Sequence, residues 1–425
     1  MINFKKLSLI FKDKQIRNKI LITFFLLAIF RLAANIPVPG VNLENLKRMF
    51  LENQFLGLLN VFVGGALSNL SIVMLGVGPY ITATIILQLL TMIFPKLEEL
   101  YKEGGEEGRQ KFNQYARILT VPLAFLEGYG MLNLFVKQNI ISFSSSYHLL
   151  TSLITITAGS VFLMWLGELI TENGVGNGIS LLILAGILAR TPVEVRSFLL
   201  KWDVANLPSY ILFFASSILI IVCVVFVNEA KRNIPISYVK RVRGNKIYGG
   251  VSTYLPLNVN PAGVIPIIFA LSVLLFPTMV ANLLQGLNNP TILAASKSVV
   301  NFLQNQWVHG TLFFILVFAF TFFYTLVTFE PKTISENLQK VGGFIPGVRP
   351  GEQTSLFLQK ILNNVLYIGA TFLGVIAVLP SIVQGITKVA EFQFLIGGTS
   401  LLIVVSVILE TWRALEAEIE MKEYD

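Results

Sequence analysis

The sequence predicts an all-α polytopic membrane protein, on the basis of its composition, the length of its apolar segments and the distribution of its basic residues. Hydrophobic residues make up 54% of the 425 residues and charged residues only 13%. Soluble domains usually carry about 25% charged residues. The mean hydropathy is +0.71. This composition excludes an ordinary soluble domain.

Ten apolar segments approach or reach the roughly 20 residues that a helix needs to cross a bilayer. They lie at 20–36, 74–94, 118–136, 149–170, 174–189, 209–228, 262–282, 310–329, 361–383 and 394–412. An even number of spans places both termini on one side. With that side cytoplasmic, the inner segments hold 23 Lys and Arg residues and the outer connections 8. This is the bias that membrane insertion follows, so both termini are expected inside, and the net charge of +8 needs no nucleic acid to explain it.

The N-terminal stretch 1–19 places Ile2, Phe4, Leu7 and Phe11 among lysines. This pattern is typical of a short helix in the headgroup region, although topogenic charge alone also explains it. In the span that follows, Arg31 lies near the outer end, from where its long side chain can reach the interface.

The stretch from 56 to 94 is longer than one span needs, and glycines interrupt it at Gly64–Gly65 and from Gly76 to Pro79. We expect a short half-helix, a break and then a full helix. Backbone that is not helical is tolerated at membrane depth only when it is buried in protein or lines a water-filled cavity. The stretch therefore indicates a segment that faces a lumen. A packing seam of small residues is the alternative interpretation.

Two connections are rich in glycine. The turn in "ELITENGVGNGISLLI" (168–183) is expected to join two spans tightly, because a phosphate-binding loop would require a preceding strand. The loop "FEPKTISENLQKVGGFIPGVRPGEQT" (329–354) holds Arg349 among Gly347, Pro350 and Gly351. A polar loop with so constrained a backbone indicates a docking site.

The stretch "ISYVKRVRGNKIYGGVSTYLPL" (236–257) alternates β-branched or aromatic residues with polar ones around Gly244–Asn245, which predicts a β-hairpin. Its tip carries Lys240, Arg241, Arg243 and Lys246. Such a tip can contact RNA phosphates or an acidic protein surface. Topogenic charge explains the basic residues but not the hairpin.

The sequence offers little for catalysis or ion coupling. The single Cys223 allows no disulfide framework, and the two histidines, His148 and His309, form no metal-binding pair, so no enzyme activity and no cofactor are expected. A secondary transporter would place ionisable groups at mid-depth. Glu127 is the candidate there, and one carboxylate without an evident partner supports that alternative weakly.

Several motifs are similar to those of the SecY family of protein-conducting channels, in their order and spacing. They are "IPVPG" at 36–40, "GGALSNLSI" followed by "PYITATIILQLL", "NGVGNGIS", "VNPAGVIPIIFA" at 259–270, "GVRPGEQT" at 347–354 and "GGTSLLIVV" at 397–405. The resemblance runs from Phe4 to Trp412. It implies two inverted, pseudo-symmetric halves of five helices around a central pore, with a lateral gate to lipid.

The resemblance also implies roles for individual residues. The pore ring falls on Ile81, Ile85, Ile183, Ile268 and Ile403, and the spacing of Ile81 and Ile85 agrees, because residues four apart share a helix face. The lateral gate falls on Gln88, Ser272 and Phe276, for which ordinary hydrogen bonding and packing between helices is an equally good interpretation. The half-helix becomes a plug made of Asn60, Val61, Phe62, Val63, Gly64, Gly65, Ala66, Leu67, Ser68, Asn69 and Leu70.

The implied function is a passive channel in the cytoplasmic (plasma) membrane that passes unfolded secretory proteins and releases transmembrane segments into lipid. The implied partners are SecE-like and SecG-like small subunits, a SecA-type ATPase, the ribosome, signal peptides and nascent chains. The expected divisions are an N-terminal segment (1–19), a first half (20–195), a second half (196–412) with loops 229–260 and 330–360, and an acidic tail (413–425).

Overall fold

The computed structural model describes residues 13–38, 63, 65–67, 69–102, 104–137, 140–141, 145–200, 207–238, 241–243, 246–248, 252–284, 290–387 and 398–423. Of the residues with an expected role, Asn60, Val61, Phe62, Gly64, Ser68 and Lys240 lie outside this part of the chain.

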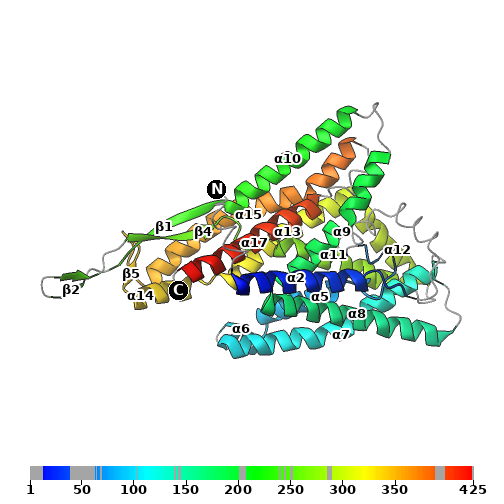
Figure 1. Cartoon of the computed structure of the whole chain (residues 1–425), viewed down its shortest axis with the longest axis horizontal. Helices are drawn as coiled ribbons and strands as arrows, with labels where there is room; N and C mark the ends of the chain where they lie inside the picture. Colours follow the sequence, from blue (N-terminus) through cyan, green and yellow to red (C-terminus); the bar gives the residue numbers. More distant parts are fainter. Residues whose placement is uncertain are drawn as a thin grey trace.

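A helix overlaps each of the ten predicted spans. These helices are α2 (Lys14–Ala33), α5 (Gly78–Thr91), α7 (Gly105–Lys137), α8 (Ser146–Asn173), α9 (Gly178–Leu200), α10 (Leu207–Glu229), α11 (Ile265–Leu284), α13 (Gln306–Thr328), α15 (Glu352–Thr387) and α17 (Gly398–Glu423). Three shorter helices are α6 (Pro95–Lys102), α12 (Pro290–Gln304) and α14 (Pro331–Lys340). The long helices run roughly along the longest axis of the molecule (Figure 1).

Six of the described helices are long and apolar enough to cross a membrane, or seven if α5 and α6, bent by 113° at their junction, form one span. The helix α2 carries Lys14, Arg17, Lys19 and Arg31, which lowers its apolar character. Ten membrane crossings therefore stay a prediction. The helices that do qualify make the chain a multi-pass membrane protein.

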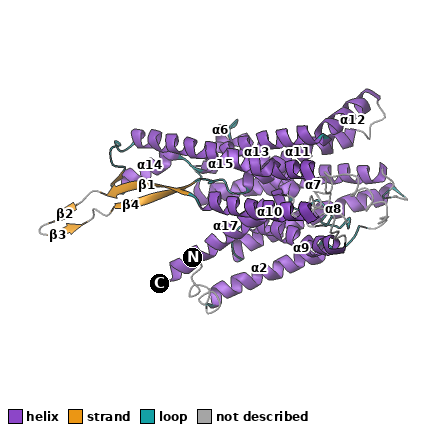
Figure 2. Ribbon diagram, turned by 90° about the horizontal axis from the view of Figure 1, so that it is seen from above, coloured by secondary structure: helices purple, strands orange, loops and turns teal. Residues whose placement is uncertain are grey.

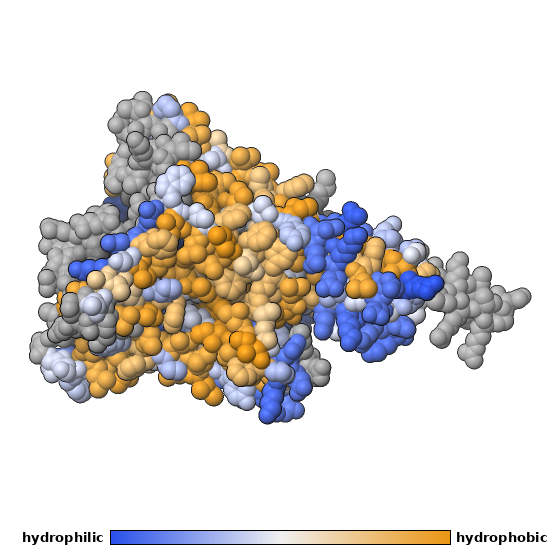
Figure 3. Space-filling view, turned by 180° about the vertical axis from the view of Figure 1, so that it is seen from behind, coloured by the Kyte–Doolittle hydropathy of each residue, from blue (hydrophilic) through white to orange (hydrophobic). Residues whose placement is uncertain are grey.

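The surface has the polarity expected of such a protein. Only 24% of the most apolar stretch of α10 is buried inside the chain, and Phe226 in it is 74% exposed. Figure 3 shows apolar residues over the helical body and hydrophilic residues gathered toward one end. In Figure 1 that end carries the strands and α14. The apolar helical surface suits contact with lipid.

Capping residues explain where several helices begin. Asp13 accepts hydrogen bonds from the backbone N–H groups of Gln15 (2.7 Å) and Ile16 (3.3 Å) at the start of α2. Ser145 and Asn305 do the same for α8 and α13. Such side chains satisfy donors that the first turn of a helix leaves free. At the other end of α8, Gly174 takes the C-cap position and the helix ends there.

The predicted hairpin is confirmed, and it is larger than expected. Strand β1 (Lys231–Tyr238) pairs antiparallel with β4 (Ser252–Asn258), and β2 (Arg241–Arg243) pairs with β3 (Lys246–Tyr248). The pairing of Arg243 with Lys246 leaves two residues for the turn. A third strand, β5 (Gly343–Phe344), joins β1 from the loop after α14, and the sequence did not predict it. Figure 2 shows the strands projecting from the helical body.

The expected half-helix near 60–70 is not seen in the described residues there, which form consecutive turns instead. The N–H groups of Leu70, Met74 and Gly76 each donate to the carbonyl three residues earlier. Gly65 (φ 81°) and Gly76 (φ 62°) reverse the backbone, which interrupts any helix. The full helix begins only at Gly78.

The expected divisions of the chain differ from the helix boundaries. The acidic tail is the last part of α17, because this helix continues to Glu423, and residues 14–19 belong to α2. The boundary at 195/196 falls inside α9. In Figures 1 and 2 the start of α2 and the end of α17 lie at the end of the molecule that carries the strands.

Candidate functional site

The five isoleucines of the expected pore ring are all buried. Their exposed fractions are 5% (Ile81), 2% (Ile85), 2% (Ile183), 5% (Ile268) and 1% (Ile403). They come from α5, α9, α11 and α17, and all belong to one hydrophobic cluster. The fold thus brings side chains that are more than 300 positions apart in sequence into one apolar core.

Residues of the expected plug belong to the same cluster. Val63, Ala66, Leu67 and Leu70 are buried there with the isoleucines. Val63 lies against Gly76, where an added Cβ would come within 3.1 Å of Val63 Cγ1. A small residue at 76 is therefore what allows Val63 to pack at this place.

Two backbone hydrogen bonds attach these turns to the segment that follows α2. The N–H of Val38 donates to the carbonyl of Leu70 (2.8 Å), and the N–H of Ile72 donates to the carbonyl of Ile36 (3.0 Å). Leu70 has φ of 42°, a left-handed conformation that costs a bulky residue about 1–3 kcal/mol. Its side chain is fully buried. Packing and pairing on both sides hold this strained residue in place.

A cavity of about 750 Å³ borders the isoleucines. Ile81 and Ile268 line it together with Gln88. Its polar lining comes from the start of α7, the end of α8 and the start of α9, and includes Gln110, Asn113, Gln114, Glu168, Glu172 and Asn177. Polar side chains of the cavity thus lie next to two of the buried isoleucines.

An ion pair crosses from α7 to α8 in the wall of this cavity. Arg117 Nε donates to Glu168 Oε1 at 2.7 Å, and the two side chains are 44% and 17% exposed. The pair neutralises the only arginine in the cavity lining that the structure describes. Glu106 and Glu172 also line the cavity, so its described lining carries a net negative charge.

The expected gate residues lie on α5 and α11, two helices that contact each other. Gln88 and Ser272 are buried, and Phe276 is half-buried. Gln88 Oε1 accepts no hydrogen bond from the described residues. Gln88 also lines the polar cavity, so its amide lies where the apolar seal and the cavity meet.

Glu127, on α7, is 5% exposed. Its Oε2 lies about 4.0 Å from the position that a Cβ on Gly78 would occupy, at the start of α5. The described residues hold no group of three or more His, Cys, Asp or Glu side chains that could bind a metal ion. An ion-coupling cluster of several carboxylates is likewise not seen around Glu127 in the described part of the chain.

The expected docking residues lie on the projecting loops. Arg241 and Arg243 are in β2, and Lys246 is in β3. Arg349 is exposed, and its carbonyl accepts a hydrogen bond from Thr354 Oγ1 (2.9 Å). Ser335 Oγ donates to the carbonyl of Gly351 at 2.6 Å, so the loop around Arg349 is fixed to α14.

The two loops share one small core, which the sequence did not reveal. Ile234 and Leu257 of the hairpin are buried against Ile345 of the second loop and Leu358 at the start of α15. The signal available in the sequence was the alternation of apolar residues along β1, which the structure shows as alternating burial. One face of such a strand requires an apolar partner. The alternation does not say where in the sequence that partner lies.

The chain was compared with known proteins. The SecY family model matches residues 71–412. The protein translocase subunit SecY of Thermotoga maritima is 42% identical, over 98% of this chain and 95% of the relative, and that of Halalkalibacterium halodurans is 41% identical, over 99% of both. No comparison supports a solute transporter.

Solved structures agree on the fold. A structure described as a protein-conducting channel has a TM-score of 0.67 at 18% identity and covers 95% of this chain and 92% of the other. Sec61 in a canine ribosome-channel complex has a TM-score of 0.64 at 17% identity, with the same coverage. Together with the family model and the relatives, these likenesses lead to one conclusion. The chain belongs to the SecY family.

Proposed function

We propose that this chain is the pore-forming subunit of a protein translocase, a passive channel for unfolded secretory proteins. The observation that carries the proposal is the meeting of a polar cavity of about 750 Å³ with a cluster that contains five buried isoleucines and the plug residues. A narrow apolar constriction blocks ions because water and ions occupy it at high cost. The isoleucines form this seal, and the described plug residues Val63, Ala66, Leu67 and Leu70 close it.

Planar-bilayer conductance of Ile268→Asn and Ile403→Asn channels, normalised to folded protein, tests the seal. Both variants are expected to leak ions at rest, because asparagine wets the constriction. Ile156→Asn is the matched control, since Ile156 is fully buried in the same cluster but on α8. Loss of packing alone lowers protein yield equally in all three variants and leaves no leak, and that result contradicts the proposal.

The seam between α5 and α11 is the lateral gate through which apolar segments enter lipid. The contact between these helices and the cavity that Gln88 and Ile268 line beside them support this role, because the seam then borders the path of the transported chain. Gln88, Ser272 and Phe276 are the gate residues. An apolar segment that enters between α5 and α11 takes the place of the apolar contact that these two helices make with each other.

Both termini, the hairpin and the loop around Arg349 face the cytoplasm, and the protein lies in the plasma membrane. The division of 23 against 8 basic residues supports this orientation. Replacing the single Cys223 by serine gives a protein without cysteine, into which single cysteines are introduced for labelling. A cysteine at 349 should react only from inside, and a cysteine at the exposed Tyr147, in an outer connection, only from outside. Labelling of 349 from outside contradicts the orientation.

Energy for transport comes from partners, because a passive channel does no work itself. The exposed Arg349 and the basic hairpin with Lys240, Arg241, Arg243 and Lys246 dock a SecA-type ATPase or the ribosome. Charge-assisted hydrogen bonds to acidic groups or RNA phosphates suit these side chains. SecE-like and SecG-like membrane subunits complete the complex. Purification in mild detergent followed by mass spectrometry tests this composition.

A further inference from the structure

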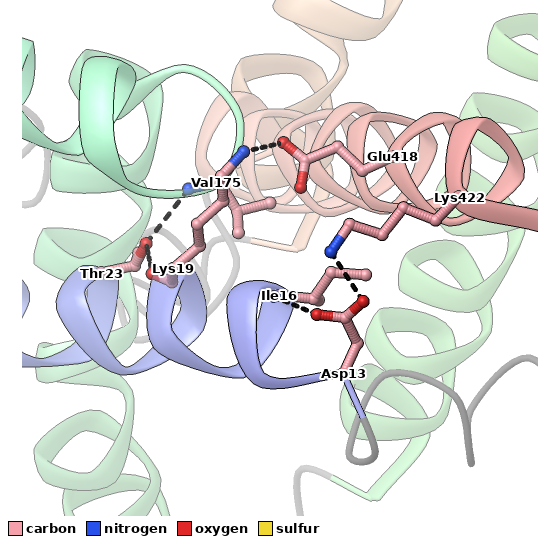
Figure 4. Close-up of polar contacts among 7 residues, drawn as sticks. All are labelled: Asp13, Ile16, Lys19, Thr23, Val175, Glu418 and Lys422. Carbon is pink, nitrogen blue, oxygen red and sulfur yellow. Dashed lines mark hydrogen bonds and ion pairs between the residues drawn. The ribbon is translucent and has the colours of Figure 1, made fainter. Parts of the chain in front are cut away.

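The first and last described helices are joined by side chains near the start of α2 and the end of α17 (Figure 4). Lys422 Nζ lies 2.6 Å from Asp13 Oδ2, and Lys19 Nζ lies 2.6 Å from Glu418 Oε1. Between these ion pairs, Ile16 (2% exposed) packs against Ile419 (4% exposed). Asp13, Ile16 and Lys19 at the start of α2 meet Lys422, Ile419 and Glu418 of α17, in that order. The two helices therefore run antiparallel through the contact.

The glycine-rich turn between α8 and α9 is a third component of this contact. Val175 N donates to Thr23 Oγ1 at 3.2 Å, and an added Cβ on Gly174 would come within 2.5 Å of the same oxygen. On the other side, an added Cβ on Gly176 would lie 3.5 Å from Thr411 Oγ1 of α17. Lack of space thus requires glycine at 174, and the φ of 72° favours glycine at 176. We call Asp13, Ile16, Lys19, Thr23, Val175, Glu418, Ile419 and Lys422 the terminal clasp.

The first five long helices contact the last five at two seams. At one seam α11 contacts α5 and α7, and at the other α17 contacts α9 and reaches α2 through the clasp. A channel that opens sideways must separate one seam while the other holds. The α5–α11 seam borders the polar cavity, which Ile81, Gln88 and Ile268 line, whereas the clasp contains two ion pairs, a buried isoleucine pair and a hydrogen bond from a backbone N–H.

We propose that the terminal clasp keeps the α2–α9–α17 seam closed during transport, so that opening is confined to the seam between α5 and α11. The clasp residues are positioning residues, since none of them lines the cavity. The proposal rests on the proposed lateral gate and adds the element that decides which seam moves. It also gives the charged ends of α2 and α17 a role beyond topogenic charge.

A charge reversal in the native complex, reconstituted in vesicles, tests the clasp. Glu418→Lys places two lysines face to face, and we expect at least a threefold rise in resting ion conductance per folded channel. The swap Lys19→Glu/Glu418→Lys restores the attraction and should return conductance to within twofold of the wild type. Lys111→Glu is the matched control, because Lys111 forms an exposed 2.7 Å pair with Glu107 on α7 alone. A Glu418→Lys channel that behaves like Lys111→Glu overturns the proposal.

A second experiment joins the two helices covalently. In a Cys223→Ser background, Lys19→Cys/Glu418→Cys, at positions whose side chains are 40% and 26% exposed, is joined by a short bis-maleimide linker. We expect translocation and membrane integration to stay within twofold of the unlinked channel, because this seam does not open. Arrest of both by the linker overturns the proposal. Failure of the unlinked and wild-type vesicles to translocate at all would instead count against the proposed function, so the two failures are distinguishable.

Discussion

Ser237 of the hairpin and Phe344 of the second loop are antiparallel partners in the sheet, one position from the pair formed by Tyr238 and Gly343. This short pairing joins two segments about 100 positions apart in sequence, and their common core contains Ile234, Leu257, Ile345 and Leu358. The basic hairpin and the exposed Arg349 therefore belong to one structural unit.

Replacing Ile345 by alanine should loosen this unit. The side chain is 2% exposed, so its truncation is expected to cost about 2–5 kcal/mol locally. We expect weaker docking of the ATPase although Arg349 and the hairpin charges are unchanged. Leu356→Ala is the control, because Leu356 is 53% exposed and its truncation should change stability by less than about 0.5 kcal/mol. Unaltered ATPase binding by Ile345→Ala would show that the two loops dock independently.

Arg349→Glu should abolish motor-dependent translocation while the protein stays folded and inserted. The reason is that hydrogen bonds from Thr354 and Ser335 to backbone carbonyls fix the loop from which the exposed Arg349 side chain extends. Transport into inverted vesicles, with the amount of folded channel measured in parallel, checks the expectation. Lys360→Glu, an equal charge change on the exposed side of α15, should transport normally. Normal transport by Arg349→Glu would reduce Arg349 to a topogenic charge.

Gly76→Ala should weaken the seat of the plug and raise resting conductance. Its φ of +62° costs a residue with a Cβ about 1–2 kcal/mol, and that Cβ would lie 3.1 Å from Val63 Cγ1. Gly263→Ala separates the two effects, because Gly263 has the same φ of +62° but nothing within 4 Å of the added Cβ. Equal leakage in both variants would mean that backbone strain, and not the contact with Val63, is responsible.

The terminal clasp should persist at mildly acid pH. The hydrogen bond from Lys422, with those from the backbone of α2, lowers the pKa of Asp13 below its ordinary value of 3.8. A lowered pKa gives stability that is present above the unfolded-state value and is lost as the pH falls through the folded-state value. The distance between spin labels on α2 and α17 is therefore expected to stay constant from pH 7 to pH 5. An increase within that range would mean that another group controls the contact.

Much of the fold follows from local sequence. Apolar segments of spanning length predicted the helices, because in lipid the backbone N–H and C=O groups of such a segment must hydrogen-bond to each other. The Gly244–Asn245 turn between alternating residues predicted the hairpin for an equally local reason. The interruption at Gly76 and the full helix after it follow the expectation from the glycines, whereas the described residues between 63 and 70 form turns and not the expected half-helix.

The candidate site depended more on resemblance than on pattern. Isoleucine in a membrane helix packs or faces lipid, so nothing in the sequence distinguishes Ile268 or Ile403 from its neighbours. Both are buried in the cluster that contains the plug residues, a relation that arises only when helices far apart in the sequence pack together. Their role as a seal stays a prediction.

The sequence by itself determined that the protein lies in a membrane, where its helices form and which loops are rich in lysine and arginine. These properties depend on composition and on residues close together in the chain. The tertiary structure alone decided that β5 completes the hairpin sheet, that Val63 packs on Gly76, and that Asp13 and Lys19 meet Lys422 and Glu418. Such contacts join residues up to 409 positions apart. Which of many possible partners a side chain meets depends on the packing of whole helices, and the local sequence does not encode that choice.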